Sequence, residues 1–353
     1  MRALLLWPGA PLALASAALF GASTPFAKLL VGTIDPWLLA GLLYLASGFV
    51  LGLWMGARRI LGRPTGEAPL RRHDLPWLAG VVFSGGVVGP VLLMIGLSGV
   101  TASAAALLLN LEGLATMAIA WLAFRENVDR RILAGALAIL AGAVVLSWQA
   151  DGDLAVDWGV VAIVGACLAW GIDNNLTRKL SSADPIQIAT AKGLVAGAIN
   201  VSLALANGAS LPRAEIVAAA GVVGLLGYGV SIALFVLALR HLGTARTGAY
   251  YSTAPFIGAL LSIAMLAEPA SWQFVVAGSL MAAGVWLHLV ERHEHRHRHE
   301  PMEHEHRHRH DAHHLHEHGS QDPPGEPHSH RHRHGRLVHS HAHYPDLHHR
   351  HRH

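Results

Sequence analysis

The stretch Trp77–Leu97 reads WLAGVVFSGGVVGPVLLMIGL, and Ala102–Phe124, which reads ASAAALLLNLEGLATMAIAWLAF, follows it after a gap of four residues. Each stretch has about the 20 predominantly apolar residues that a helix needs to cross a bilayer. Glu112 is the one charged residue in either of them. Two such runs with a short connection predict a pair of antiparallel membrane-spanning helices.

Apolar runs of this kind continue through most of the chain. Of the 353 residues 52% are hydrophobic and 14% are charged, whereas soluble domains average about 25% charged residues. The sequence therefore predicts an all-α polytopic membrane protein with ten transmembrane helices. We expect them at Leu12–Val31, Trp37–Gly56, Trp77–Leu97, Ala102–Phe124, Ile132–Trp148, Trp158–Asn175, Pro185–Ala206, Ile216–Leu239, Thr247–Ala267 and Gln273–Val290.

The basic residues indicate the orientation in the membrane. If the N-terminus is cytoplasmic, the connections on that side carry twelve Lys and Arg residues, against Arg213 alone on the other side. Positively charged connections stay in the cytoplasm, so we expect a plasma (inner) membrane protein with both termini cytoplasmic. The formal net charge of +3 is too small to indicate a nucleic-acid partner.

Short motifs recur in the same order at an offset of about 142–150 residues. They predict two five-helix repeats, 1–150 and 151–290, followed by a tail at 291–353. Five is an odd number, so the second repeat is inverted relative to the first, as in many secondary transporters with a substrate site between the halves. The matched motifs are Asp35-Pro36 with Asp184-Pro185, Val100-Thr101-Ala102 with Gly243-Thr244-Ala245, and Phe124-Arg125-Glu126 with Ala267-Glu268.

Two long stretches carry a family resemblance. One starts at Leu107, LLLNLEGLATMAIAWLAFREN, and the other at Ala245, ARTGAYYSTAPFIGALLSIAMLAEPASWQFVVAGSLMAAGVWL. They resemble the two EamA-type repeats of the drug/metabolite transporter superfamily, with Glu126 and Glu268 where that family has a Glu before its last helix. The resemblance covers about Leu12 to Val290, and the chain looks like a subgroup with a His-rich tail. It implies a transporter but no substrate, because members carry amino acids, sugars, nucleotide precursors, amines and drugs.

Glu112 is the first candidate for a functional residue inside the membrane. Ionisable groups at bilayer depth are costly and are therefore candidates for function. Burial favours the protonated form of a lone carboxylate, so Glu112 could carry a proton or bind a cationic group of a substrate. Asn110 lies two residues before it. The alternative is a silent Glu, hydrogen-bonded within the helix bundle.

A second group of polar residues lies on the sixth and seventh predicted helices. Asp173, Asn174 and Asn175 end the sixth, and Lys192 lies on the seventh, about 10 Å into the membrane at 1.5 Å per residue. Asp173 and Lys192 have similar depth, which predicts an ion pair between them. The pair could be structural or part of a substrate site.

Four further residues are weaker candidates. Lys28 lies near the outer end of the first helix, where snorkelling to the interface is an alternative explanation. Tyr228 lies at mid-membrane, and Tyr250 and Tyr251 lie on the ninth predicted helix; all three could line a cavity or simply pack.

The tail is dominated by histidine. All 26 histidines of the chain except His73, His241 and His288 lie in 291–353, where they alternate with Arg and Glu. With too few apolar residues to form a core, we expect a disordered tail that binds Zn, Ni, Co or Cu or, when protonated, anionic lipid headgroups. The candidate ligands are His293, His295, His297, His299, His304, His306, His308, His310, His328, His330, His332 and His334.

The leading hypothesis is a transporter, and specifically an exporter, of a small organic solute or drug, monomeric or homodimeric. It needs no cofactor and is no enzyme, since the sequence has no nucleophile motif and no Walker loop. The alternatives are a divalent metal-ion transporter whose tail gathers ions, and a non-transporting metal- or pH-sensing membrane protein. The histidines outside the tail lie near predicted membrane edges, which argues against metal as the cargo.

Overall fold

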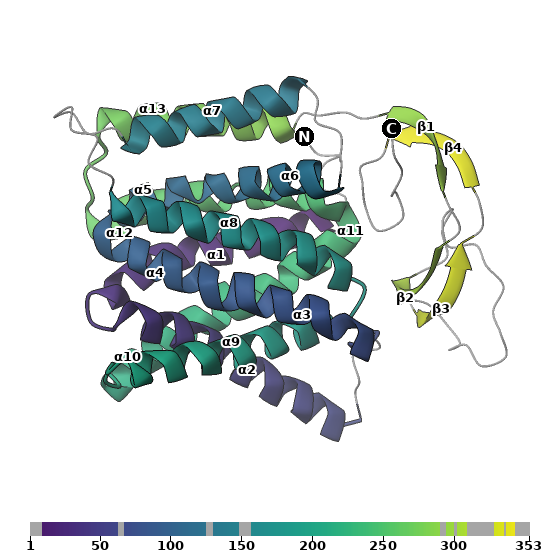
Figure 1. Cartoon of the computed structure of the whole chain (residues 1–353), viewed down its shortest axis with the longest axis horizontal. Helices are drawn as coiled ribbons and strands as arrows, with labels where there is room; N and C mark the ends of the chain where they lie inside the picture. The colour runs from purple at the N-terminus through teal and green to yellow at the C-terminus, as the bar shows by residue number, and fades with distance from the viewer. Residues whose placement is uncertain are drawn as a thin grey trace.

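The helices lie side by side in a bundle (Figure 1), as expected for the all-α fold that the sequence predicts. The computed structural model describes residues 9–62, 67–124, 130–147, 157–289, 294–299, 302–308, 328–334 and 337–342. Seven of the helical segments described are long and apolar enough to cross a membrane, and three shorter apolar helices complete the set of ten. The prediction of an all-α polytopic membrane protein is confirmed.

The first half has five segments. They are α1 (Gly9–Val31), α2 (Pro36–Ile60), a third made of η2 (Arg72–Asp74), α3 (Leu75–Val81), η3 (Val82–Val88) and α4 (Gly89–Gly99), a fourth made of α5 (Ala102–Leu108) and α6 (Asn110–Phe124), and α7 (Arg130–Ser147).

The second half also has five. They are α8 (Trp158–Leu180), α9 (Pro185–Ala206), a third made of α10 (Ala214–Gly224), η4 (Leu225–Val230) and α11 (Ser231–Tyr251) as far as Leu242, a fourth made of the end of α11 and α12 (Ala254–Leu266), and α13 (Trp272–Leu289).

Equivalent helices of the two halves begin in the same way. Asp35 caps α2 by accepting hydrogen bonds from two backbone amides of its first turn, and Asp184 caps α9 likewise. Both caps are followed by a proline at the first helical position, where its missing N–H costs nothing. The repeated Asp-Pro is thus a helix start in both halves.

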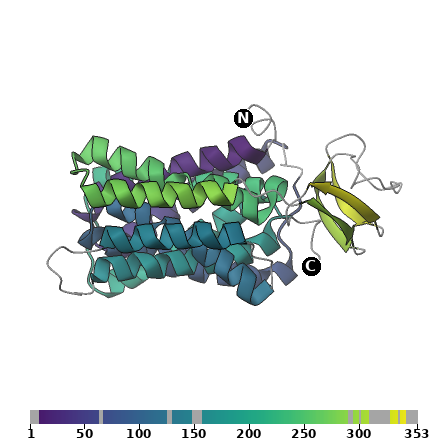
Figure 2. The ribbon, with the colours of Figure 1, turned by 90° about the horizontal axis from the view of Figure 1, so that it is seen from above.

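The packing follows a pseudo-twofold relation between the halves. α2 packs on its equivalent α9, and α7 packs on its equivalent α13. α1 packs on α11 and α12, just as its equivalent α8 packs on α4 and α6. Figure 2 shows α7 and α13 side by side on one face of the bundle.

Each half also contains one π-helix, η3 in the first and η4 in the second, at equivalent positions of its third segment. π-helical turns are rare and are frequently found at functional sites. Both coincide with glycine-rich stretches, and both lie within helical spans that agree with the predicted helices at Trp77–Leu97 and Ile216–Leu239.

Glycines bring α2 and α9 into backbone contact. A Cβ at Gly48 would collide with the backbone of Gly193 and Leu194, and a Cβ at Gly193 would lie 2.6 Å from the Gly48 nitrogen. Small residues that allow such close approach drive helix association in membranes. This contact joins the two halves near the middle of both helices.

The chain reverses direction inside α11, between the predicted eighth and ninth helices. The ring centroids of Phe235 and Tyr251 lie 4.9 Å apart, whereas the same number of residues in a straight helix would span about 24 Å. The apolar span that begins at Ala214 ends at Leu242, close to the predicted end at Leu239, and a further break follows at Ser252–Thr253. Pro255 lies in the first turn of α12, where proline is favoured at a helix start.

Glu268 lies before the last helix, but its hydrogen bonds go to the other half of the chain. Ala267, in the left-handed conformation with φ 51°, turns the chain after α12. The two Glu268 carboxylate oxygens then accept hydrogen bonds of 2.8 and 2.9 Å from the backbone amides of Ala102 and Ser103. Glu268 therefore caps the first turn of α5, in the other half. Glu126 lies outside the described residues.

The tail differs from the prediction of a disordered segment. β1 (Glu294–His299) pairs with β4 (Leu337–Ala342), and β2 (Met302–His308) pairs with β3 (His328–His334), both antiparallel. Alternation of His with Arg or Glu has the period of two of an extended chain. Each ladder has two strands, which is marginal for stability in water. His293 and His310 lie outside the described residues, and disorder in the remainder of 291–353 stays a prediction.

We expect Gly193→Ala to lower the melting temperature of the purified protein. The added methyl group would overpack the contact between α2 and α9, at a cost of about 1–3 kcal/mol. The matched control is Gly56→Ala in α2, where a Cβ meets nothing within 4 Å. That control should leave the melting temperature unchanged or raise it slightly, and equal destabilisation by both variants would contradict the packing role.

Candidate functional site

A cavity lies between the two halves, near the middle of the helices that surround it. Its empty space, including the part open to solvent, is about 500 Å³. The first half contributes Phe20, Tyr44 and Glu112. The second half contributes Trp170, Asp173, Asn174, Thr177, Lys192, Gly227, Tyr228, Ser231, Ile232, Phe235, Val236 and Tyr251.

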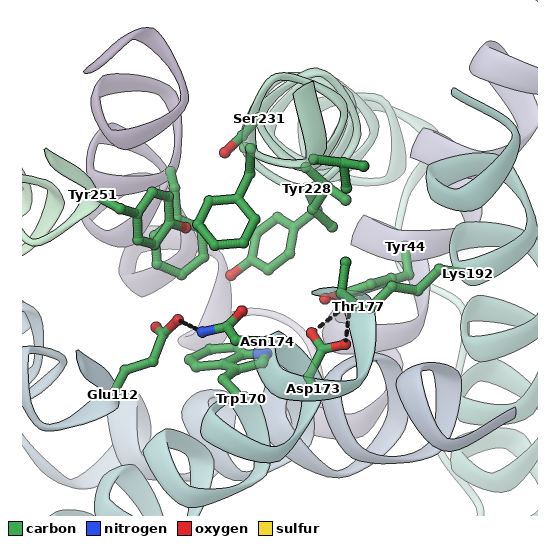
Figure 3. Close-up of a pocket in the computed structure, with 15 residues that line it drawn as sticks. Tyr44, Glu112, Trp170, Asp173, Asn174, Thr177, Lys192, Tyr228, Ser231 and Tyr251 are labelled. Carbon is green, nitrogen blue, oxygen red and sulfur yellow. Dashed lines mark hydrogen bonds and ion pairs between the residues drawn. The ribbon is translucent and has the colours of Figure 1, made fainter. Parts of the chain in front are cut away.

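One face of α8 supplies much of the polar lining. Trp170, Asp173, Asn174 and Thr177 follow the spacing of three and four residues that places side chains on one helical face. Figure 3 shows Asn174 near the centre of the cavity, with Glu112 on one side and Asp173 on the other.

The predicted ion pair between Asp173 and Lys192 is present. Lys192 Nζ lies 2.5 Å from Asp173 Oδ2, and both residues are 4% exposed. Thr177 Oγ1 donates a second hydrogen bond, of 3.1 Å, to Asp173 Oδ1. Each charge of the pair is therefore neutralised inside the protein, as burial requires.

The π-helix η3 provides the room for this pair. A Cβ at Gly85 would overlap the Asp173 carboxylate, and one at Gly86 would lie 3.5 Å from Lys192 Cγ. Gly85 O also accepts hydrogen bonds from Tyr44 Oη at 2.8 Å and from Trp170 Nε1 at 3.1 Å. Gly85 thus makes space for the Asp173 carboxylate and fixes two aromatic rings of the cavity wall.

Glu112 is held differently. Asn174 Nδ2 donates to Glu112 Oε1 over 2.9 Å and also lies 3.1 Å from Thr116 Oγ1. No described residue donates a hydrogen bond to Glu112 Oε2, and no described cation pairs with the carboxylate. Glu112 lines the cavity and is thus a carboxylate with an unused oxygen.

A break in the fourth segment sets the position of Glu112. α5 ends at Leu108 and α6 begins at Asn110, so Glu112 lies in the first turn of α6. The N-terminus of a helix stabilises negative charge. Discontinuous helices whose ends point into a midplane site are common in transporters.

Aromatic rings form the apolar wall. The Phe20 ring centroid lies 5.7 Å from that of Trp170, 5.8 Å from that of Tyr228 and 5.6 Å from that of Tyr251. Tyr44 packs on Tyr228, and Phe235 packs on Tyr251. In Figure 3, Tyr228 and Tyr251 face Glu112 and Asn174 across the cavity.

The structure brings six of the ten membrane candidates to this cavity and places four elsewhere. Lys28 donates hydrogen bonds to the backbone oxygens of Leu97 and Val100 at the end of α4. Asn110 donates to Leu107 O, and Asn175 bridges Thr116 O and Gly171 O. Tyr250 packs beside a small apolar cluster of α1 and α11.

Sequence reasoning missed several residues of the cavity wall. Trp170 and Thr177 could have been found from their spacing to Asp173 and Asn174 on α8. Phe20 and Tyr44 could not, because an aromatic residue in an apolar helix has the same pattern whether it faces lipid or a cavity.

Two five-helix halves of inverted topology around a polar midplane cavity are the architecture of a secondary transporter. The EamA-like transporter family matches the chain twice, at residues 7–148 and at residues 157–290. The chain belongs to this family and is a membrane-embedded transporter of the drug/metabolite type, in agreement with the resemblance of its two repeats.

Two relatives extend the comparison. An uncharacterized transporter of Methanothermobacter thermautotrophicus is 28% identical over 284 residues, which span 76% of this chain and 82% of the relative. A protein of known crystal structure is 21% identical, with a TM-score of 0.61 over 79% of this chain and 95% of its own. The latter shows the shared fold.

We expect Lys192→Met to destabilise the protein by about 3–5 kcal/mol, because it leaves Asp173 buried without its cation. Thermal unfolding in detergent measures the effect. Adding Asp173→Asn to the same chain should restore most of the stability, since no buried charge then remains. Arg213→Met, at an exposed position, is the control. A single variant as stable as the control would rule out a structural contribution of the pair.

Proposed function

We propose that this protein is a secondary active exporter that carries a small organic solute across the membrane through the cavity between its halves. The observation that carries the proposal is the cavity itself, with its lining drawn from both halves and its charges in the middle of the helices. Alternating access by movement of one repeat against the other would expose such a site to each side in turn.

The polar residues have separate roles in this proposal. Glu112 contacts the solute or a coupling proton, because one of its oxygens is unused. The pair of Asp173 and Lys192 positions α8 against α9. The described residues that line the cavity include no histidine and no cysteine, and we propose transport without covalent chemistry and without a required cofactor.

The position in the cell is part of the proposal. The excess of Lys and Arg on one side supports the plasma (inner) membrane, with both termini in the cytoplasm. The lipid bilayer is the environment of the ten helices. A single chain encloses the cavity, so a monomer or a homodimer could carry out the transport.

A role for the tail is supported by one observation. The register of β2 and β3 sets three His of one strand opposite three of the other: His304 with His332, His306 with His330 and His308 with His328. Cross-strand neighbours lie about 4.5–5.5 Å apart at Cβ, and imidazole suits Zn, Ni, Co and Cu. We propose that the tail binds such a metal as a regulator, while the cavity carries the organic solute.

We expect Glu112→Gln to reduce transport by the purified protein in proteoliposomes by at least about tenfold, since it removes the free charge of the cavity. Solutes are first found by thermal stabilisation, because a ligand that binds the folded state raises the melting temperature in a dose-dependent way. Glu215→Gln, at an exposed position of α10, is the control and should transport normally.

Divalent metals are screened in the same way, on the full chain and on a chain without 291–353. Stabilisation that needs the tail supports metal as a regulator. If a metal is the one ligand that stabilises the shortened chain, the cargo is the metal and the proposal of an organic solute fails. If no solute of any kind is transported, a non-transporting sensor remains.

A further inference from the structure

We infer that the cavity binds a monovalent organic cation, in which an ammonium or similar group is attached to an aromatic or apolar body. This inference rests on the proposed function and names its substrate class. Three features of the cavity carry it: its charge balance, its aromatic wall and the state of its one lysine.

The charge balance is negative by one. The cavity contains two carboxylates, Glu112 and Asp173, and one cation, Lys192. Asp173 is satisfied on both oxygens, by Lys192 at 2.5 Å and by Thr177 at 3.1 Å. Glu112 receives one hydrogen bond from a neutral amide. The ionised Glu112 therefore carries the one negative charge that no lysine balances, and a single positive charge on the ligand would balance it.

The wall around that charge suits an organic cation. Phe20 lies with its ring centroid within 6 Å of three other rings, those of Trp170, Tyr228 and Tyr251. Aromatic faces attract cations within about 6 Å, and cages of such rings recognise ammonium groups. The remaining lining includes Ile232, Phe235 and Val236, which suit an apolar body.

Other solute classes fit less well. An anion or a zwitterion would place a carboxylate in the cavity, and Lys192, the cation to receive it, is already engaged with Asp173. A sugar needs many polar partners, whereas aromatic and aliphatic side chains make up most of this wall. A bare divalent metal takes six or more oxygen ligands as Ca²⁺ or an octahedral shell as Mg²⁺, and one unused carboxylate is a poor site for it.

The test uses ligands matched in shape and different in charge. On a phenyl scaffold these are 2-phenylethylammonium, 2-phenylethanol, phenylalanine and 3-phenylpropionate, and the same four head groups are placed on indolyl and cyclohexyl scaffolds. Dissociation constants are measured by titration calorimetry on the full chain in detergent. We expect the cation to bind best on at least one scaffold, by roughly tenfold or more over its neutral partner.

Two variants locate the binding. Glu112→Gln should abolish the preference for the cation and leave 2-phenylethanol unchanged. Phe20→Leu keeps an apolar side chain but removes the central ring. It should weaken binding of the cation by about three- to tenfold and leave the affinity for the neutral ligand unchanged. Phe83→Leu, at a ring 66% exposed on the outside of the bundle, is the matched control.

Each outcome decides the question. Preference for the cation that is lost in Glu112→Gln supports the inference. Preference for phenylalanine or 3-phenylpropionate, or cation binding that Glu112→Gln does not change, overturns the inference, while the proposed transport stands if the preferred ligand is carried into proteoliposomes. Failure of every cation to bind also overturns it. Failure of all twelve ligands to bind, together with an absence of any transported solute, overturns the proposed function as well.

Discussion

The backbone oxygen of Gly85 connects three helices around the cavity. It accepts hydrogen bonds from Tyr44 on α2 and from Trp170 on α8, and the next oxygen, that of Gly86, accepts one from Asn200 on α9. No water is available at bilayer depth to satisfy a free backbone group, so protein groups must do so. A π-helix offers such groups to its neighbours, and the absence of a side chain at Gly85 leaves room for the Asp173 carboxylate of the ion pair.

The two halves are equivalent in plan and different where the cavity forms. In the first half the chain breaks at Leu109, and Glu112 follows the break in the first turn of α6. In the second half it breaks at Ser252–Thr253, and Tyr251 precedes the break at the end of α11. Both breaks therefore face the cavity, one with a carboxylate and the other with an aromatic ring. The inverted repeat supplies the symmetric frame, and substitutions at equivalent positions make the site asymmetric.

Much of the fold could be predicted because membrane-spanning helices are long, apolar and separated by turn residues. The Asp-Pro motifs at Asp35 and Asp184 were reliable signals, since they begin helices in both halves. The break at Leu109 could not be predicted, because no glycine or proline marks it. Local sequence is ambiguous at such points, and tertiary packing decides.

The site was partly predictable for a related reason. Glu112, Asp173 and Lys192 are conspicuous because charge is costly in a membrane. The pairing of Asp173 with Lys192 could be predicted because the two residues lie at similar depth in the membrane. The aromatic wall was harder to foresee, since a helix in lipid has an apolar surface on every side and hydrophobic periodicity does not distinguish inside from outside. Glu268 shows the same limit: the sequence places it before the last helix, but its hydrogen-bond partners Ala102 and Ser103 lie in the other half.

The single unused carboxylate has a consequence for energetics. One proton or one monovalent cation neutralises Glu112, so exchange of the two moves no net charge and is electroneutral. The empty, ionised cavity is different, because moving one elementary charge across the membrane potential involves about 2.3 kcal/mol per 100 mV. Under the proposed function, exchange of a proton for a monovalent cation would therefore not be driven by the membrane potential, whereas return of the empty, ionised cavity would depend on it.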